Sequence, residues 1–391
     1  MSRFDHHFRM QEKDCIDFIK EKLPGFFSGN DLKCTEIGDG NINYVFRVSD
    51  SEKSLIVKHA DAFFRDSTKP KSVDRSHLES EMLMIEKDLC PDHIPDIYYY
   101  DETMCAIVMQ DIGDHENMRY ALIEHEIFPE FAHSISSFLI NTLIRTGIYG
   151  LPIEKKREYE SRYTNHDMCE ITDRLVFSEP YTNRLGSNVI TEGNEEYVKE
   201  KLYEDDDLHY EVGLLKNAFQ SKRQSLIHGD LHSGSIFVRK DSMKVLDPEF
   251  GIMGPAGYDV GNVLAHLIFA FYNSRYTDKN NAFEEWIKEC IAKICDTFIE
   301  GSKELIEEIN TDKMYSGKRF IDEYIGDIMS DSFGYAGTEL IRRIVGSAKV
   351  RDLEVPDRIR AEREMIELAI KMIKNRKTMT GDSVISLMEG E

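Results

Sequence analysis

The sequence predicts an α+β fold in two lobes, a small antiparallel β-rich lobe at the N-terminus and a larger, mainly helical lobe after it. Two observations support this prediction. Up to residue 112, short apolar runs are separated by tight polar turns, a pattern typical of strands. Beyond Gly113 the apolar residues recur about every 3.6 positions, which is typical of helices. We therefore expect an N-terminal lobe over 1–112, with a connector at 109–112, and a C-terminal lobe over 113–391.

Composition and charge exclude several classes of protein. Hydrophobic residues make up 41% and charged residues 31% of the chain, so a globular protein is expected rather than a disordered one. A net charge of −23 without a basic face argues against a nucleic-acid partner. The seven cysteines are odd in number and none are spaced C-x-x-C, which argues against disulfides and zinc. The N-terminus lacks an apolar signal segment and the longest apolar run, 265–272, is too short for a bilayer, so a cytoplasmic protein without a membrane partner is expected.

The N-terminal lobe is expected to hold one sheet. An amphipathic pattern predicts a helix over about 14–23, and three strands joined by tight turns follow within 32–60. A second helix is predicted over 77–89. The β-rich runs 96–102 and 104–113 add two strands, so the sheet should have five strands and one inserted helix.

The C-terminal lobe is expected to be helical with one interruption. Helical periodicity covers 128–147, 206–223 and most of 255–375. Between them, residues 226–250 contain short apolar runs that read as strands. This interruption carries the residues with the clearest chemistry.

The interruption contains the string HGDLHSGSIF, which includes Asp230, and then LDPEF, which includes Asp247 and Glu249. Phosphoryl transfer needs one carboxylate to accept a hydroxyl proton and others to hold magnesium against the phosphates. A lone loop aspartate often only caps a turn, and a pair of acids at a strand end is often only solvated. The spacing of all three nevertheless favours a phosphotransferase site.

Lys58 ends the apolar run SLIVK. A lysine at a strand end is usually only solvated, so its partner matters. Two glutamates of the predicted helix 77–89, Glu79 and Glu81, lie about 200° apart around it, so only one of them can face the lysine.

Arg342 and Arg343 are adjacent inside the otherwise apolar helical run FGYAGTELIRRIVGSA. Arginines are common on helix surfaces, but apolar neighbours on both sides place at least one of these two against a packed face. A buried arginine needs a carboxylate or a ligand as its partner.

These strings resemble known families. HGDLHSGSIF is similar to the catalytic loop of the kinase-like phosphotransferases, the superfamily of aminoglycoside, choline and methylthioribose kinases. The D-x-E form of LDPEF with the following GPAGYDVG, the turn DGNIN and the arginine pair all resemble the methylthioribose kinases, and the resemblance covers nearly the whole chain. It implies a protein-kinase-like fold and transfer of the γ-phosphate of ATP to the 1-hydroxyl of 5-methylthioribose in methionine salvage, by a magnesium-dependent homodimer.

The resemblance also implies roles for residues at the nucleotide. Lys58, with Glu79 beside it, would reach the phosphates, and Asn41 of the DGNIN turn would approach the nucleotide. The backbone of Gln110, Asp111 and Ile112 would bind the adenine edge. Asp247, Pro248 and Glu249 would complete this site, with Asp247 and Glu249 as the magnesium ligands.

At the acceptor, the resemblance implies that Asp230 is the catalytic base and contacts the sugar together with Arg342 and Arg343. We expect Arg343 to face the sugar and Arg342 to support it. Ser235 stands where many relatives carry a metal-binding asparagine, and the segment 65–76 lacks the tryptophan that many methylthioribose kinases have near the sugar.

Two other functions remain open at this point. The chain could phosphorylate another small alcohol, such as choline, homoserine or an aminoglycoside, but a cationic substrate suits an acidic or aromatic pocket better than an arginine pair. It could also be a catalytically silent nucleotide-binding scaffold. The joint presence of Lys58, Asp230, Asp247 and Glu249 argues against that alternative.

Overall fold

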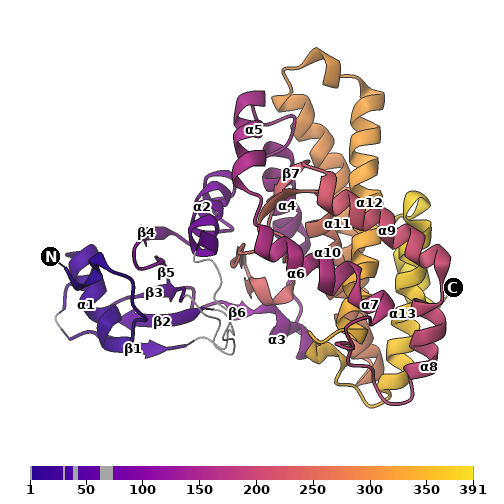
Figure 1. The fold of residues 1–391 in the computed structure, drawn as a ribbon, viewed down its shortest axis with the longest axis horizontal. Helices are drawn as coiled ribbons and strands as arrows, with labels where there is room; N and C mark the ends of the chain where they lie inside the picture. The colour runs from indigo at the N-terminus through magenta and orange to yellow at the C-terminus, as the bar shows by residue number, and fades with distance from the viewer. Residues whose placement is uncertain (1, 30, 38–42, 62–73, 391) are drawn as a thin grey trace. The chain divides into compact units, whose positions relative to one another are not determined.

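The computed structural model describes residues 2–29, 31–37, 43–61 and 74–390 (Figure 1). The chain forms two compact units. The first comprises residues 1–115 together with 244–249, and the second comprises 116–243 and 250–391. The sequence-based boundary after residue 112 lies three residues earlier, and it placed 244–249 with the C-terminal part.

The first unit is built on one antiparallel sheet of five strands in the order β1-β2-β3-β5-β4. Helix α1 packs against β1 and β2, and α2 connects β3 to β4, which confirms the predicted five strands and one inserted helix. The elements are α1 (Glu12–Lys22), β1 (Lys33–Glu36), β2 (Tyr44–Ser49), β3 (Ser54–His59), α2 (Asp74–Leu89), β4 (Ile97–Asp101) and β5 (Ala106–Gln110).

Strand alternation separates a hydrophobic face of this sheet from the face that carries Lys58. Successive side chains of a strand point to opposite faces. Phe46 and Val57 belong to a core cluster that also takes in Phe4 and Phe18 from the N-terminal segment. Lys58 follows Val57 and therefore points to the opposite face. The same alternation that builds the core thus directs the lysine away from it.

The second unit is mainly helical, which together with the sheet confirms the predicted α+β class. Helix α10 lies at its centre, because every residue from Gly257 to Ser274 is buried. It packs against α11 and α12, and α12 packs in turn against α13, the yellow helix of Figure 1. The helices are α3 (Met118–Ile123), α4 (Phe131–Arg145), α5 (Ile153–Arg162), α6 (His166–Phe177), α7 (Glu179–Thr182), α8 (Glu195–Val198), α9 (Asp206–Ser221), α10 (Gly257–Tyr276), α11 (Asn281–Ile309), α12 (Lys318–Val345), α13 (Arg358–Asn375) and α14 (Gly381–Glu389).

Short strands interrupt the helices; β7, β8 and β9 lie where the sequence predicted strands, whereas β6 and β10 were not predicted. Strand β7 pairs with β10, and β6 pairs with β8, all antiparallel. The loop from residue 228 to 232, which follows β7, carries Asp230. The strands are β6 (Glu116–Asn117), β7 (Ser225–Ile227), β8 (Ile236–Arg239), β9 (Ser242–Val245) and β10 (Ile252–Gly254).

None of the seven cysteines forms a disulfide. Within the ranges that the structure describes, every helix is too short or too polar to cross a lipid bilayer.

Candidate active site

Lys58 lies at the centre of a charged cluster in the first unit. Its Nζ atom donates to Glu79 Oε1 at 2.6 Å and also bonds to a carboxylate oxygen of Asp247. Glu79 is 1% exposed, and it comes from α2, which packs on β4 and β5. Of the two candidate glutamates, Glu79 is therefore the partner, while Glu81 pairs with His77 at 3.3 Å.

Asp247 is held in an unusual backbone conformation. Its φ angle is +65°, in the left-handed region that residues other than glycine seldom adopt. Its side chain is 49% exposed, although one oxygen contacts the buried Lys58. Nearby, Asn43 Nδ2 donates to Glu249 Oε2 at 3.4 Å. Backbone strain of this kind is concentrated at functional sites.

The cluster carries more negative than positive charge. Burial, together with the carboxylates of Glu79 and Asp247, raises the pKa of Glu249 to about 7 against the opposing charges of Lys58 and Arg75. Three carboxylates thus face two cations. A further cation would relieve this excess, and hard carboxylate oxygens suit magnesium.

Asp247 and Glu249 fit a magnesium site of the kind completed by substrate. Magnesium is usually held by one or two protein carboxylates plus phosphate oxygens and water, not by an all-protein cage. No group of three or more histidine, cysteine, aspartate or glutamate side chains able to hold a metal occurs in the described part of the chain.

The connector at the end of β5 is fixed by Asp111. Its carboxylate accepts two hydrogen bonds from Arg47, at 2.6 and 3.0 Å, and one from Ser54 Oγ at 2.6 Å. Gln110 is held through its backbone N–H, which donates to Asp96 O at 2.8 Å, and Ile112 is buried. The Asp111 side chain is thus occupied in holding the segment, which leaves the backbone as the part that could meet a ligand.

In the second unit, Asp259 shapes the loop that carries Asp230. The Asp259 carboxylate, in the first turn of α10, accepts hydrogen bonds from the backbone N–H groups of His228 at 2.6 Å and Gly229 at 2.9 Å. Burial raises the pKa of Asp259, and the two N–H donors and His228 counteract part of that effect. The helix thereby sets the backbone immediately before Asp230.

Gly229 is required by this loop, and replacing it with alanine should destabilise the protein. Its φ angle is +79°, and a Cβ atom there would lie 2.3 Å from Phe250 O. A strained backbone and a clash with main-chain atoms together should lower the free energy of unfolding by about 2–4 kcal/mol. Urea denaturation would measure this, and Gly213→Ala is the control, because nothing lies within 4 Å of its added Cβ. Equal stability of the two variants would contradict the assigned role.

Asp230 is surrounded by cationic and polar groups. Arg342 Nη2 donates to Asp230 Oδ1 at 3.2 Å, Arg343 Nη2 lies 3.9 Å from the same oxygen, and His232 Nε2 lies 3.4 Å from Oδ2. Burial alone would raise the pKa of Asp230, but His232 and the two arginines hold it below its usual value. Because burial lowers the pKa of His232 to about 3, the histidine is neutral at pH 7 and the arginines supply the charge.

Glu339 binds both arginines and was not predicted. Arg343 Nε donates to Glu339 Oε1 at 2.8 Å, and Arg342 Nη2 donates to the same oxygen at 3.1 Å. Although burial would raise the pKa of Glu339, the arginines hold it well below its usual range. The string E-L-I-R-R contains the signal, because residues three and four apart lie on one face of a helix.

His266 completes this network from α10. Its Nε2 lies 3.4 Å from Glu339 Oε1, and Ser233 Oγ lies 2.9 Å from its Nδ1. Burial lowers the pKa of His266 to about 4, so at pH 7 it is neutral, donating to Glu339 and accepting from Ser233. Glu339 is thus held between α10 and the two arginines.

Other predicted positions have mixed outcomes. Asn41 lies outside the described residues, as does most of the segment 65–76. Pro248 is buried between the two carboxylates of the Asp-Pro-Glu string. Ser235 donates to the backbone oxygen of Asp230 at 3.1 Å, so it supports the loop.

Comparison with known proteins places these clusters in context. The profile of the Phosphotransferase enzyme family matches residues 170–288. A methylthioribose kinase of Bacillus cereus strain AH820 is 32% identical over 375 residues, covering 94% of this chain and 93% of that protein. A methylthioribose kinase of Bacillus mycoides strain KBAB4 is 33% identical over 379 residues, with the same coverage.

Among solved structures, a choline kinase from Cryptosporidium parvum matches with a TM-score of 0.50 at 15% identity, over 93% of this chain and 95% of that one. At this identity the likeness concerns the fold alone. It confirms the predicted kinase-like fold.

Proposed function

The chain belongs to the methylthioribose kinase family, and we propose that it transfers the γ-phosphoryl group of ATP to the 1-hydroxyl of 5-methylthioribose. The observation that carries this proposal is the environment of Asp230. Arg342 and Arg343 keep its carboxylate ionised despite burial, so at neutral pH it can accept a proton. The catalytically silent scaffold gives no reason for a carboxylate kept in that state.

In the proposed reaction, Asp230 accepts a hydrogen bond from the attacking hydroxyl and then takes its proton. The largely dissociative transition state of phosphoryl transfer needs an oriented nucleophile more than a strong base, so a carboxylate of low pKa is adequate. The guanidinium groups of Arg342 and Arg343 would donate to sugar oxygens and to the charge that develops on the transferred group.

At the nucleotide, we assign the phosphates to Lys58, which Glu79 holds in place. The backbone of Gln110, Asp111 and Ile112 would bind the adenine edge, and Asn41 would approach the nucleotide from its turn. Asp247 and Glu249, joined by Pro248, would hold magnesium, which supplies neutralisation of the phosphate charge when bound. The excess of negative charge around Lys58 supports this assignment.

Asp247→Asn should raise the magnesium concentration needed for activity and weaken nucleotide binding. The substitution removes one of the two carboxylate charges proposed to bind magnesium, so the metal should bind more weakly. The half-saturating magnesium concentration should rise on the order of tenfold. Titration of activity with magnesium at saturating ATP measures it. A half-saturating concentration equal to that of the unmodified enzyme would remove Asp247 from the metal site.

Substitution of the arginines by lysine should separate their roles. Lysine keeps the charge but loses the planar fork, so at the sugar-facing position KM for 5-methylthioribose should rise while KM for ATP stays within about twofold. At the other position the main effect should be a loss of about 1–3 kcal/mol of stability. We expect Arg343 to face the sugar, although Arg342 donates to Asp230 at the shorter distance of 3.2 Å. Unchanged kinetics and melting temperature in both variants would contradict both roles.

A coupled ADP-release assay with magnesium and ATP tests the proposed function. We expect 5-methylthioribose to give the highest kcat/KM in a panel with choline, homoserine and an aminoglycoside. Faster turnover of one of these would assign the chain to that substrate. No ADP release with any of them, from folded protein that binds ATP, would favour the silent scaffold.

We further propose that the chain acts as a homodimer in the cytoplasm, as the family resemblance implies. Sedimentation equilibrium across a range of protein concentrations would measure the oligomeric state. A single species of 45.3 kDa at all concentrations would contradict the dimer.

A further inference from the structure

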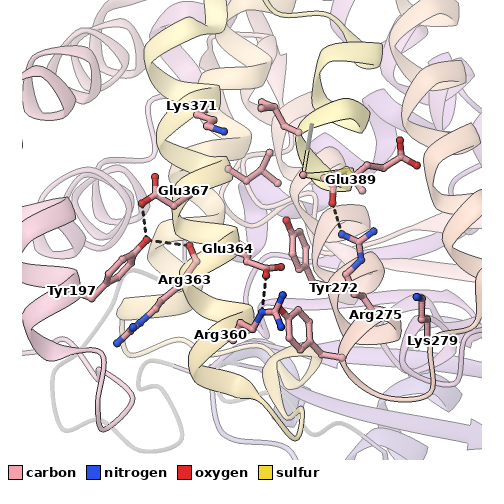
Figure 2. A pocket seen from close by; sticks show the side chains of 15 residues that line it. Tyr197, Tyr272, Arg275, Lys279, Arg360, Arg363, Glu364, Glu367, Lys371 and Glu389 are labelled. Carbon is pink, nitrogen blue, oxygen red and sulfur yellow. Dashed lines mark hydrogen bonds and ion pairs between the residues drawn. The ribbon is translucent and has the colours of Figure 1, made fainter.

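A cavity of about 700 Å³ lies where the last turns of α10 and α14 meet the side of α13 (Figure 2). Cavities of about 300–1,000 Å³ are typical of small-molecule sites. Its lining shares no residue with the clusters around Lys58 and Asp230. The proposed reaction therefore gives this cavity no role.

Cationic side chains line the cavity although the protein as a whole carries a net charge of −23. Five of them are present, Arg275, Lys279, Arg360, Arg363 and Lys371. Three acids are also present, Glu364, Glu367 and Glu389. Whether the cavity is positive depends on how these charges are paired.

The three acids are already neutralised. Arg360 Nε donates to Glu364 Oε1 at 3.0 Å, as the dashed line in Figure 2 shows. The partners of the other two acids come from outside the lining. Glu367 pairs with Lys201 at 3.1 Å, and Glu389 pairs with Lys288 at 2.6 Å.

The remaining cations form weak ion pairs with carboxylates or none among the described residues. Arg363 donates to two neutral oxygens, Asn194 Oδ1 and Gly193 O, each at 2.8 Å. Lys279 and Lys371 form no ion pair within 4.0 Å among the residues that the structure describes. Arg275 donates to Met388 O at 2.5 Å, and among the described residues it forms one ion pair, with Glu284 at 4.0 Å. The cavity is therefore positive, and Arg275 and Arg363 are held in fixed positions.

Aromatic rings accompany these charges. The rings of Tyr272 and Tyr276 are nearly parallel, at 14°, with centroids 6.4 Å apart. The Arg363 guanidinium lies 4.9 Å from the ring centroid of Tyr197. Flat rings beside cations suit a ligand that has both an aromatic ring and a negative charge.

We propose that this cavity binds a small phosphate ester with an aromatic ring, of the nucleoside monophosphate class. The Arg275 guanidinium can donate to phosphate oxygens, and Lys279 and Lys371 supply the two charges that balance a dianion, whereas the fork of Arg363 is taken up by Asn194 and Gly193. The ring of Tyr276, which is partly exposed whereas Tyr272 is buried, would contact the base. This site is separate from the catalytic nucleotide site proposed above.

Titration calorimetry with AMP tests this proposal. A non-hydrolysable ATP analogue and magnesium first saturate the catalytic nucleotide site of the full-length protein. We expect one further AMP to bind, and the double variant Lys279→Gln/Lys371→Gln to weaken that binding at least tenfold. The control Lys313→Gln/Lys318→Gln removes the same charge from the segment before α12 and into its first turn, and it should leave AMP affinity within about twofold.

Inorganic phosphate and adenosine separate the contributions of charge and ring. Phosphate alone should bind and compete with AMP, and adenosine should bind more weakly than AMP. Absence of a further AMP site, equal affinity in the cavity variant, or adenosine binding as tightly as AMP would each overturn the proposal. Because no sugar and no turnover are involved, failure here is distinct from failure of the proposed kinase activity.

Discussion

Asp230→Asn will lower turnover of 5-methylthioribose by a factor of about 10²–10⁴, the range usual for loss of a general base. Asparagine has nearly the same shape and can still accept a hydrogen bond from Arg342, which donates to Asp230 Oδ1 at 3.2 Å. It cannot take the proton of the attacking hydroxyl. ATP affinity should stay nearly unchanged, because the nucleotide is assigned to Lys58 and its neighbours. Steady-state kinetics with equilibrium ATP binding measure both quantities.

Asp241→Asn is the matched control for this variant. Asp241 is exposed in the turn between β8 and β9, where it accepts a hydrogen bond from Arg239 at 2.8 Å. The Asp241→Asn variant should therefore turn over 5-methylthioribose at the rate of the unmodified enzyme. If Asp230→Asn and Asp247→Asn weakened ATP binding equally, the division between base and metal ligands would be wrong. Turnover of Asp230→Asn within tenfold of the unmodified enzyme would likewise remove Asp230 as the base.

Glu339→Ala will lower the free energy of unfolding by about 3–5 kcal/mol, because breaking a buried ion pair leaves its partners uncompensated. The carboxylate is 1% exposed and binds both Arg342 and Arg343, so two buried guanidinium groups would lose their shared partner. Urea denaturation at pH 7 measures the change. Glu304→Ala, at an exposed position of α11, is the control and should change stability by less than about 0.5 kcal/mol.

Glu339→Gln tests whether the carboxylate also positions the arginines for catalysis. Glutamine retains the shape and one acceptor oxygen, so it should fold while holding the two guanidinium groups less firmly. We expect KM for the sugar to rise and KM for ATP to stay unchanged. A stability loss without any change in sugar kinetics would mean that Glu339 is structural only.

The sequence predicted the parts of the fold that depend on local periodicity. For the partner of Lys58, the family resemblance gave a helix glutamate and the helical spacing allowed only one of Glu79 and Glu81, and the structure selects Glu79 at 2.6 Å. The helices between residues 151 and 200 were not predicted. The segment of α5 is dominated by charge, with Tyr159 as one of its few buried residues, and α7 and α8 have four residues each. Such segments become helical through tertiary packing and not through a periodic apolar face.

Features that depend on tertiary contact could not be read from the sequence. The left-handed conformation of Asp247 follows no local rule, because aspartate seldom adopts a φ angle of +65°. The positive cavity joins Lys279 and Lys371, which are far apart along the chain. Glu339 is an intermediate case. Its spacing of three and four residues from the arginines is visible in the sequence, but its burial, which makes it their essential partner, is not.

The assignment of residues 244–249 to the first unit affects how the protein can fold during synthesis. A ribosome that has completed residue 115 has made every strand of the five-stranded sheet but not Asp247, the second carboxylate that bonds to Lys58. At about 5–20 residues per second, roughly 10 s pass before that segment is translated. During this interval Glu79 is the one carboxylate of the cluster that has been made to face Lys58. A fragment that ends at residue 115 should therefore form the sheet without the two carboxylates proposed to hold magnesium, and the C-terminal half of a split enzyme would have to supply residues 244–249 to the first unit.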